Sequence, residues 1–158
     1  MHVAQPAAEH AAYEGAAPPA AGLSQRLASL LFGPEAPRLR CFVAELGDEI
    51  IGYASCAPEL STWDGAEYLH MDCLFLRDGH RGRGVGPMLV EAVLAEARAL
   101  DLSQVQWQTP PWNGDAIRFY DRLGALPKEK RRYFLSVDRR SVDQKPVIRR
   151  DREPTTGT

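Results

Sequence analysis

The chain carries the turn Arg81-Gly82-Arg83-Gly84-Val85-Gly86 between an apolar run at residues 68–76 and its longest helical pattern. Glycines let successive peptide N–H groups converge on one point, and a helix N-terminus adds roughly half a positive charge there. Such a turn is suited to phosphate groups. It is not a dinucleotide fingerprint, because Pro87 stands where glycine is needed, nor a Walker loop, because the Lys-Ser/Thr pair is absent. The alternative interpretation is a flexible connection with two solvated arginines.

The patterns on both sides of this turn predict alternating helices and strands. Apolar residues at helical spacing predict helices over residues 23–31, 85–100 and 113–123. Apolar runs predict a hairpin with strands Phe42–Leu46 and Ile50–Cys56, a loop at Pro58–Gly65, a buried strand at Tyr68–Leu76, a short strand at 105–109 and a last strand at Arg132–Val137. The order indicates a mixed α/β domain.

Composition divides the chain into three segments. Residues 1–21 are rich in Ala and Pro and predict a mobile arm, with a short helix around Ala7–Tyr13 as the alternative. Residues 22–138 are expected to form one domain, and residues 139–158 a charged, flexible tail.

Overall composition is that of one soluble globular domain: 158 residues, 44% hydrophobic and 25% charged. With 19 basic and 21 acidic residues, the net charge of −2 argues against a nucleic-acid partner. No apolar run is long enough for a membrane span, and the first residues lack a signal-peptide pattern, so we expect a cytoplasmic protein without a membrane partner. The three cysteines have no CxxC spacing and are expected to be reduced core residues, with no metal site.

Two motifs together resemble the GNAT family of N-acetyltransferases. Arg81-x-x-Gly84-x-Gly86 matches the signature that cradles the pyrophosphate of acetyl-CoA in that family. Trp112-Asn113-x-x-Ala116-Ile117-x-Phe119-Tyr120-x-x-x-Gly124-Ala125 looks like its second cofactor segment. The resemblance implies an α/β (α+β) fold with a mostly antiparallel central sheet, parallel at two splayed strands, and helices on both faces. It also implies N-acetylation of a primary amine of a small molecule, with acetyl-CoA as co-substrate.

The resemblance assigns cofactor-binding residues. The pyrophosphate would lie on Arg81, Gly82, Arg83, Gly84, Val85 and Gly86, and backbone N–H groups of Leu74, Phe75 and Leu76 would polarise the thioester carbonyl. Asn113 is expected both to cap its helix and to reach the cofactor arm, since a cap uses only the side-chain oxygen. Pro87 departs from the family and removes one amide from the phosphate site, which predicts somewhat weaker cofactor binding.

Two residues are the catalytic candidates. Tyr120, protonated at neutral pH, is the expected general acid for the leaving thiolate; the alternative is packing against Phe119. Asp72 is the first candidate for the base that deprotonates the amine, with His70 second. Asp72 takes the place of a Glu in the diamine and thialysine acetyltransferase branch, which the chain resembles loosely, so that role is open. Either Asp72 or His70 could instead be a structural residue held by hydrogen bonds.

Acceptor recognition and assembly are less well defined by the sequence. Trp63, Asp64 and His70 are the candidate substrate-binding residues, an aromatic and acidic rim for a cationic amine, or else an ordinary surface loop. Three other functions stay open: an antibiotic-modifying or biosynthetic acyltransferase, a protein Lys or N-terminal acetyltransferase, and a non-catalytic acetyl-CoA-binding module. The family's first strand has no convincing match, which exposes the hairpin edge and predicts a homodimer.

Overall fold

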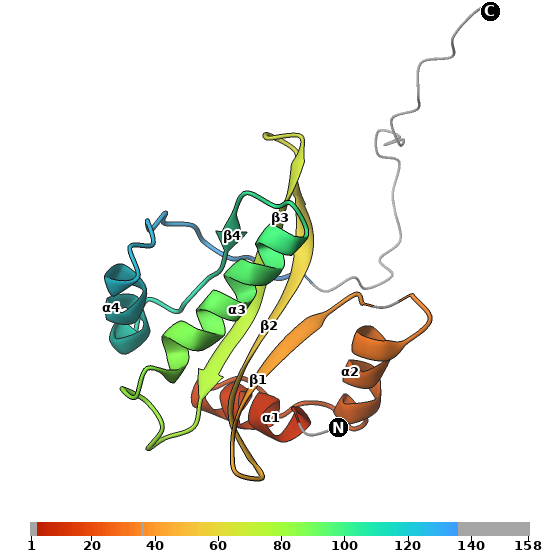
Figure 1. Cartoon of the computed structure of the whole chain (residues 1–158), viewed down its shortest axis with the longest axis vertical. Helices are drawn as coiled ribbons and strands as arrows, with labels where there is room; N and C mark the ends of the chain where they lie inside the picture. The colour runs from red at the N-terminus through yellow and green to blue at the C-terminus, as the bar shows by residue number, and fades with distance from the viewer. Residues whose placement is uncertain (1–2, 36, 136–158) are drawn as a thin grey trace, which may run out of the picture. The chain divides into compact units, whose positions relative to one another are not determined.

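A computed structural model describes residues 3–35 and 37–135. Its contacts divide the chain into two units, residues 1–125 and residues 126–158. The first unit contains, in chain order, α1 (Ala4–Tyr13), α2 (Leu23–Phe32), β1 (Arg40–Leu46), β2 (Glu49–Ser61), β3 (Ala66–Leu76), α3 (Val85–Ala99), β4 (Val105–Gln106) and α4 (Gly114–Arg122) (Figure 1).

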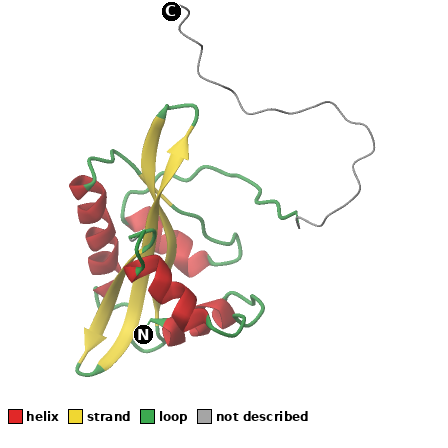
Figure 2. Ribbon diagram, turned by 90° about the vertical axis from the view of Figure 1, so that its right-hand side faces the viewer, coloured by secondary structure: helices red, strands yellow, loops and turns green. Residues whose placement is uncertain are grey.

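One sheet organises this unit. Its strands lie in the order β1-β2-β3-β4, with β1, β2 and β3 antiparallel and β3 and β4 parallel. Side chains alternate between the two faces of a strand. Ala54 and Leu69 therefore join Val93 of α3 in one core, whereas Tyr53 and Phe75 pack with residues of α1 and α2 on the other face (Figure 2). The mixed α/β fold with helices on both faces of the sheet is confirmed.

The β2–β3 hairpin is longer than the sequence predicted. The structure pairs residues 58–61 with residues 66–69, so the loop expected at Pro58–Gly65 shrinks to a turn at residues 62–65. Pro58 itself lies within β2. Leu69 donates to the Gln104 carbonyl, so its Pro58 pair is not hydrogen-bonded across β2 and β3. Proline has no N–H, and at Pro58 this group would point toward β1. Pairing of β1 with β2 stops at Arg40 and Cys56, so no β1 residue pairs with Pro58.

The first helix covers residues 4–13, where the sequence predicted a mobile arm with a short helix around Ala7–Tyr13 as the alternative. These residues form α1, and Val3 and Pro6 are buried against the sheet. Proline is tolerated here because it lies in the first helical turn. Arg77 at the end of β3 donates from Nε and Nη2 to the Glu9 carboxylate, both at 2.8 Å. An apolar first turn and a bidentate ion pair therefore hold a segment whose composition alone looks unstructured.

The other elements follow the sequence closely. The hairpin strands and the helices at residues 23–31, 85–100 and 113–123 are confirmed, but only Val105 and Gln106 of the short strand at 105–109 pair in the sheet. Among the described residues of the second unit, 126–135, there is no helix or strand, so the strand expected at Arg132–Val137 is absent over 132–135. Residues 136–137 of that strand lie outside the described residues. The division into arm, domain and tail stays a prediction.

Candidate active site

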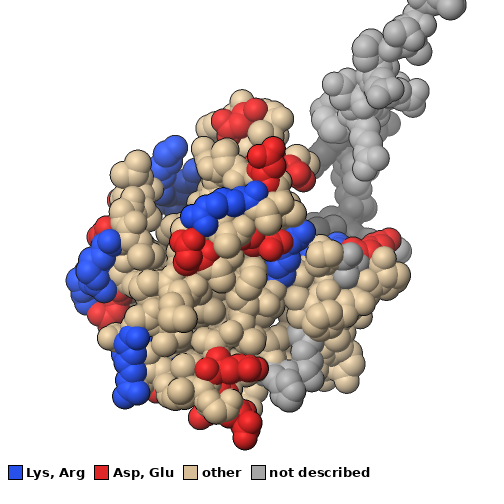
Figure 3. Space-filling model, viewed as in Figure 1, with Lys and Arg blue, Asp and Glu red and all other residues tan. Residues whose placement is uncertain are grey.

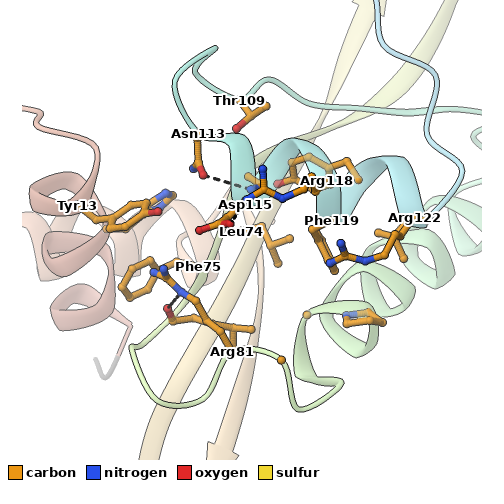
Figure 4. Close-up of a pocket in the computed structure, with 18 of the residues that line it drawn as sticks. Tyr13, Leu74, Phe75, Arg81, Thr109, Asn113, Asp115, Arg118, Phe119 and Arg122 are labelled. Carbon is orange, nitrogen blue, oxygen red and sulfur yellow. Dashed lines mark hydrogen bonds and ion pairs between the residues drawn. The ribbon is translucent and has the colours of Figure 1, made fainter.

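A cleft of about 590 Å³ lies where β3 and the chain after β4 separate (Figure 4). Elements far apart in the sequence contribute its walls: α1, β3, the glycine-rich turn and α4. The lining residues used below are His10, Tyr13, Glu14, Asp72, Leu74, Phe75, Leu76, Arg81, Gly82, Gly84, Gly86, Asn113, Asp115, Arg118, Tyr120 and Arg122.

A β-bulge in β3 gives the cleft its backbone donors. Ser55 pairs with Cys73 and Cys56 with Met71, so Asp72 is the extra residue. Beyond the bulge, the Arg77 N–H bonds to β2, at the carbonyl of Ile51. Because amides alternate along a strand, the N–H groups of Leu74 and Leu76 point to the opposite side, where β4 has already diverged. These two amides therefore face the cleft.

The glycine-rich turn forms one end of the cleft and leads into α3. Gly82 and Gly84 have φ values of +74° and +82°, a region that suits glycine, and a Cβ at either position would meet nothing within 4 Å. Gly84 is the N-cap of α3. Arg81 is held over the turn, because its Nε donates to the Leu76 carbonyl at 3.1 Å and its guanidinium lies 4.7 Å from the Tyr13 ring centre. The open backbone and the positive helix end form a concave site for an anion.

α4 contributes Asn113 and Tyr120. The Asn113 side-chain oxygen accepts from the Ala116 N–H at 3.2 Å, which confirms the predicted cap. The Asn113 side chain is among those that line the cleft (Figure 4). Tyr120 packs with its ring centre 5.1 Å from that of Trp107. Burial, with a smaller contribution from the negative charge of Glu14, raises the pKa of Tyr120 to about 12, so its hydroxyl is protonated at neutral pH.

Asp72 and Cys73 lie at the bulge, next to α1. The Cys73 thiol donates to Asp72 Oδ2 at 3.5 Å, and burial raises the pKa of this thiol to about 11, so it is a neutral donor. Asp72 is exposed and lines the cleft. A carboxylate at this position can accept a proton from a ligand in the cleft.

The structure does not bring all predicted site residues together. Trp63 is in the β2–β3 turn and is 96% exposed, and Asp64 accepts from the Ser61 hydroxyl at 2.5 Å; neither lines the cleft. His70 pairs with Ala57 and Gln106 in the sheet and is also outside the cleft lining. In the turn, Arg83 and Val85 are not lining residues either, and Val85 packs on the core beneath α3.

Sequence reasoning missed two groups of lining residues. His10 and Tyr13 belong to α1 and Glu14 is its C-cap, in a segment that the sequence predicted as a mobile arm with a short helix as the alternative. Asp115, Arg118 and Arg122 share one face of α4, and their spacing of three, four and seven residues was visible as a charged helical stripe. Arg118 and Asp115 form an ion pair within that stripe. Acidic and basic side chains are also mixed on the face drawn in Figure 3.

Comparisons with known proteins agree with this geometry. The model of the acetyltransferase (GNAT) family matches residues 9–125. L-ornithine N5-acetyltransferase NATA1 of Arabidopsis thaliana is 29% identical over 51% of this chain and 36% of its own length. Thialysine N-epsilon-acetyltransferase of Caenorhabditis elegans is 34% identical over 52% of this chain and 51% of its own. A crystal structure of a probable acetyltransferase superposes with a TM-score of 0.71 at 15% identity, covering 86% of this chain and 90% of that one.

The chain belongs to the GNAT acetyltransferase family, because the family model spans most of its length. It spans between 36% and 51% of the length of the two curated relatives, so their activities are not transferred by likeness alone. Among the described residues, none of the helices has the length and apolar character needed to cross a bilayer.

Proposed function

We propose that this chain is an N-acetyltransferase that moves the acetyl group of acetyl-CoA to the primary amine of a small molecule. The observation that carries the proposal is the pair of Leu74 and Leu76 amides, which face a cleft also lined by Tyr120. Free backbone donors beside a protonated hydroxyl are what acyl transfer needs: they stabilise a developing oxyanion and protonate a leaving group.

The residues present fit acetyl-CoA. Gly82 and Gly84 leave the backbone of the turn open, so a diphosphate can approach the amides at the start of α3 without a side chain in the way. Arg81 adds a positive charge at the same end of the cleft. When bound there, acetyl-CoA supplies an activated thioester. Asn113 would donate to its pantetheine arm, since the cap leaves the amide hydrogens free.

Four side-chain and backbone groups perform the chemistry in this proposal. The amides of Leu74 and Leu76 orient and polarise the thioester carbonyl. Asp72 takes a proton from the incoming ammonium, which is necessary because an amine of pKa near 10.4 is neutral in only about one molecule in 2,500 at pH 7. Tyr120 protonates the departing sulfur.

A small amine is favoured as the acceptor because the curated relatives are named for ornithine and thialysine acetylation. An antibiotic-modifying or biosynthetic role, a protein acceptor, and cofactor binding without catalysis remain the competing functions. Trp63, Asp64 and His70 are not carried into the proposed acceptor site. A homodimer is also proposed, since β1 is a sheet edge with Val43 42% and Leu46 59% exposed. The cytoplasmic location stays a prediction from sequence.

A panel of primary amines tests the proposal. The full chain is incubated with acetyl-CoA and each amine, and released coenzyme A is measured as free thiol. The panel contains diamines, amino acids, aminoglycosides and a Lys-containing peptide. Amine-dependent thiol release that Tyr120→Phe lowers by roughly 10²-fold or more supports the proposal. Release with the peptide alone favours a protein acceptor, and no release with any amine despite tight acetyl-CoA binding favours a binding module.

A further inference from the structure

α1 brings a histidine and a glutamate to the cleft wall next to the bulge of β3. His10 Nε2 lies 3.4 Å from Glu14 Oε1, one helical turn away. The His10 ring stacks on Phe75 of β3 with centroids 5.1 Å apart and planes at 22°. Its Nδ1 lies 3.2 Å from the Tyr53 hydroxyl of β2. The imidazole is thus fixed by contacts with two strands and lies beside the Glu14 carboxylate.

Burial determines the state of this pair. The His10 side chain is only 13% exposed, and burial lowers its pKa despite the opposing charge of Glu14. A neutral imidazole has one N–H donor. The tautomer with its proton on Nε2 directs that N–H toward the Glu14 carboxylate, 3.4 Å away, and leaves Nδ1 to accept from the Tyr53 hydroxyl. A neutral donor therefore orients a negative charge without cancelling it.

Glu14 is placed to meet a ligand. It is the C-cap of α1 and its side chain is 39% exposed, whereas Glu9 of the same helix is occupied by two hydrogen bonds from Arg77. Glu14 is also close enough to Tyr120 to raise the pKa of that hydroxyl. Glu14 and Tyr120, the residue proposed to protonate the sulfur, both line the cleft.

We propose that Glu14 binds the ammonium group of the acceptor and that His10 is the positioning residue for its carboxylate. This inference rests on the proposed function and adds a residue to it. The acceptor enters as R–NH₃⁺ against Glu14 and gives one proton to Asp72. As the N–C bond forms and the C–S bond breaks, Tyr120 delivers its proton to the sulfur, and the second proton lost by the nitrogen passes through solvent to restore the Tyr120 hydroxyl. The products are the amide, coenzyme A thiol and one released proton, and Glu14 takes no part in the proton transfers.

Steady-state kinetics with the best amine of the panel test the binding role. Glu14→Gln should raise the KM for the amine roughly 10- to 100-fold, as expected when a charged hydrogen bond is lost, and change kcat by less than about threefold. The KM for acetyl-CoA should not change. Glu91→Gln is the matched control, because Glu91 is an exposed α3 carboxylate paired with Arg98, outside the cleft lining. An unchanged amine KM in Glu14→Gln would overturn the proposal.

A pair of His10 variants tests positioning. His10→Gln retains a donor near the place of Nε2, whereas His10→Leu retains only bulk. If His10 acts through Glu14, His10→Leu should raise the amine KM severalfold. His10→Gln, at similar folding stability, should bring the KM most of the way back to that of the unchanged protein. If both variants raise the amine KM equally, in proportion to their loss of folding stability, His10 has only a structural role.

A measurement without substrate separates failure of this inference from failure of the proposed function. The His10 pKa is read by NMR, with its signal assigned by its loss in His10→Gln. The charged groups that influence it are Glu14 at the C-cap of α1, Asp72 of β3 and Arg81 of the turn. Because Glu14 raises the pKa of His10, Glu14→Gln should lower it. An unchanged value would refute the pair itself. A lowered value together with no acetylation of any amine would refute the acceptor role and the proposed function, while leaving the contact intact.

Discussion

Replacing Gly84 by aspartate and by asparagine gives a sharp test of the phosphate site. The two side chains have nearly the same shape, and both tolerate positive φ better than other residues. They differ in one negative charge. A Cβ at Gly84 meets nothing within 4 Å, so neither variant has a steric clash in the ligand-free protein. The difference in acetyl-CoA affinity between the variants therefore measures electrostatics at the turn.

The magnitude follows from Coulomb's law and from exposure. Two unit charges 4 Å apart interact by about 4 kcal/mol at an effective dielectric constant of 20, and by about 1 kcal/mol in water. Gly84 is exposed, so the repulsion between an aspartate and the diphosphate should fall between these limits, about 1–3 kcal/mol. That corresponds to a loss of affinity of about 5- to 150-fold for Gly84→Asp relative to Gly84→Asn. Added salt should reduce the difference.

Calorimetry with acetyl-CoA is the assay, and Gly47 supplies the control. Gly47 has φ of +62° in the β1–β2 turn, also with nothing within 4 Å, and is outside the cleft lining. Its Asp and Asn variants should lose similar folding stability, about 1 kcal/mol, but bind acetyl-CoA as the unchanged protein does. Equal affinity of the two Gly84 variants would refute the placement of the diphosphate at this turn.

Four other predictions follow from the site and from its supports. Tyr120→Phe should keep acetyl-CoA affinity and lower kcat by roughly 10²- to 10⁴-fold; unchanged turnover when chemistry limits the rate would remove this hydroxyl from the mechanism. Asp72→Asn should lower kcat/KM at pH 7, and part of this loss should be recovered as the pH approaches the pKa of the free amine. A large, pH-independent loss of kcat/KM would make Asp72 a structural residue. Sedimentation at micromolar concentration should give about twice 17.5 kDa, and the monomer mass would exclude the dimer. Hydrogen bonds from Arg77 lower the pKa of Glu9, so the stabilisation they provide exists above pH 4.5 and is lost as the pH falls below it. The free energies of unfolding of the unchanged protein and of Glu9→Gln should converge at acid pH, and a constant gap would contradict this.

The sequence predicted the elements whose signals are local. The stripe along Val85–Ala99 and the hairpin at β1 and β2 carry their periodicity within a few residues, so both were found. The extent of strand pairing was harder to predict from sequence. Pro58 fits in β2 only because it lies beyond the last pair of β1 and β2, Arg40 with Cys56. α1 depends on contacts from distant parts of the chain, above all Glu9 with Arg77. No window of sequence contains both partners of such a contact, so composition alone indicated an arm.

The same division applies to the candidate site. Asp72, Asn113 and Tyr120 were predicted and do line one cleft, because the family resemblance carries tertiary information that spacing does not. Regular alternation along a strand would place His70 on the same face as Asp72, two residues later. The extra residue at Asp72 breaks that alternation, so positions two apart across the bulge no longer share a face. Bulges leave no dependable trace in a single sequence, which is why this part of the site needed a structure.

The role of Tyr120 depends on a comparison of two buried groups. A tyrosine with a pKa of about 12 is a weaker acid than one in water, and transfer of its proton to a thiolate of ordinary pKa near 8.5 would be uphill by about 5 kcal/mol. However, burial acts on sulfur in the same direction, as the pKa of about 11 for Cys73 demonstrates near this cleft. For a leaving thiolate in similar surroundings, the difference between its pKa and that of Tyr120 would be nearer one, or about 1.4 kcal/mol. Burial of the leaving sulfur beside Tyr120 would therefore bring the pKa values of the acid and of its acceptor closer together. It follows that a substitution admitting water beside Tyr120, such as Trp107→Ala behind its ring, should lower kcat more than it lowers acetyl-CoA affinity. Equal losses in both quantities would show that Trp107 only shapes the binding site.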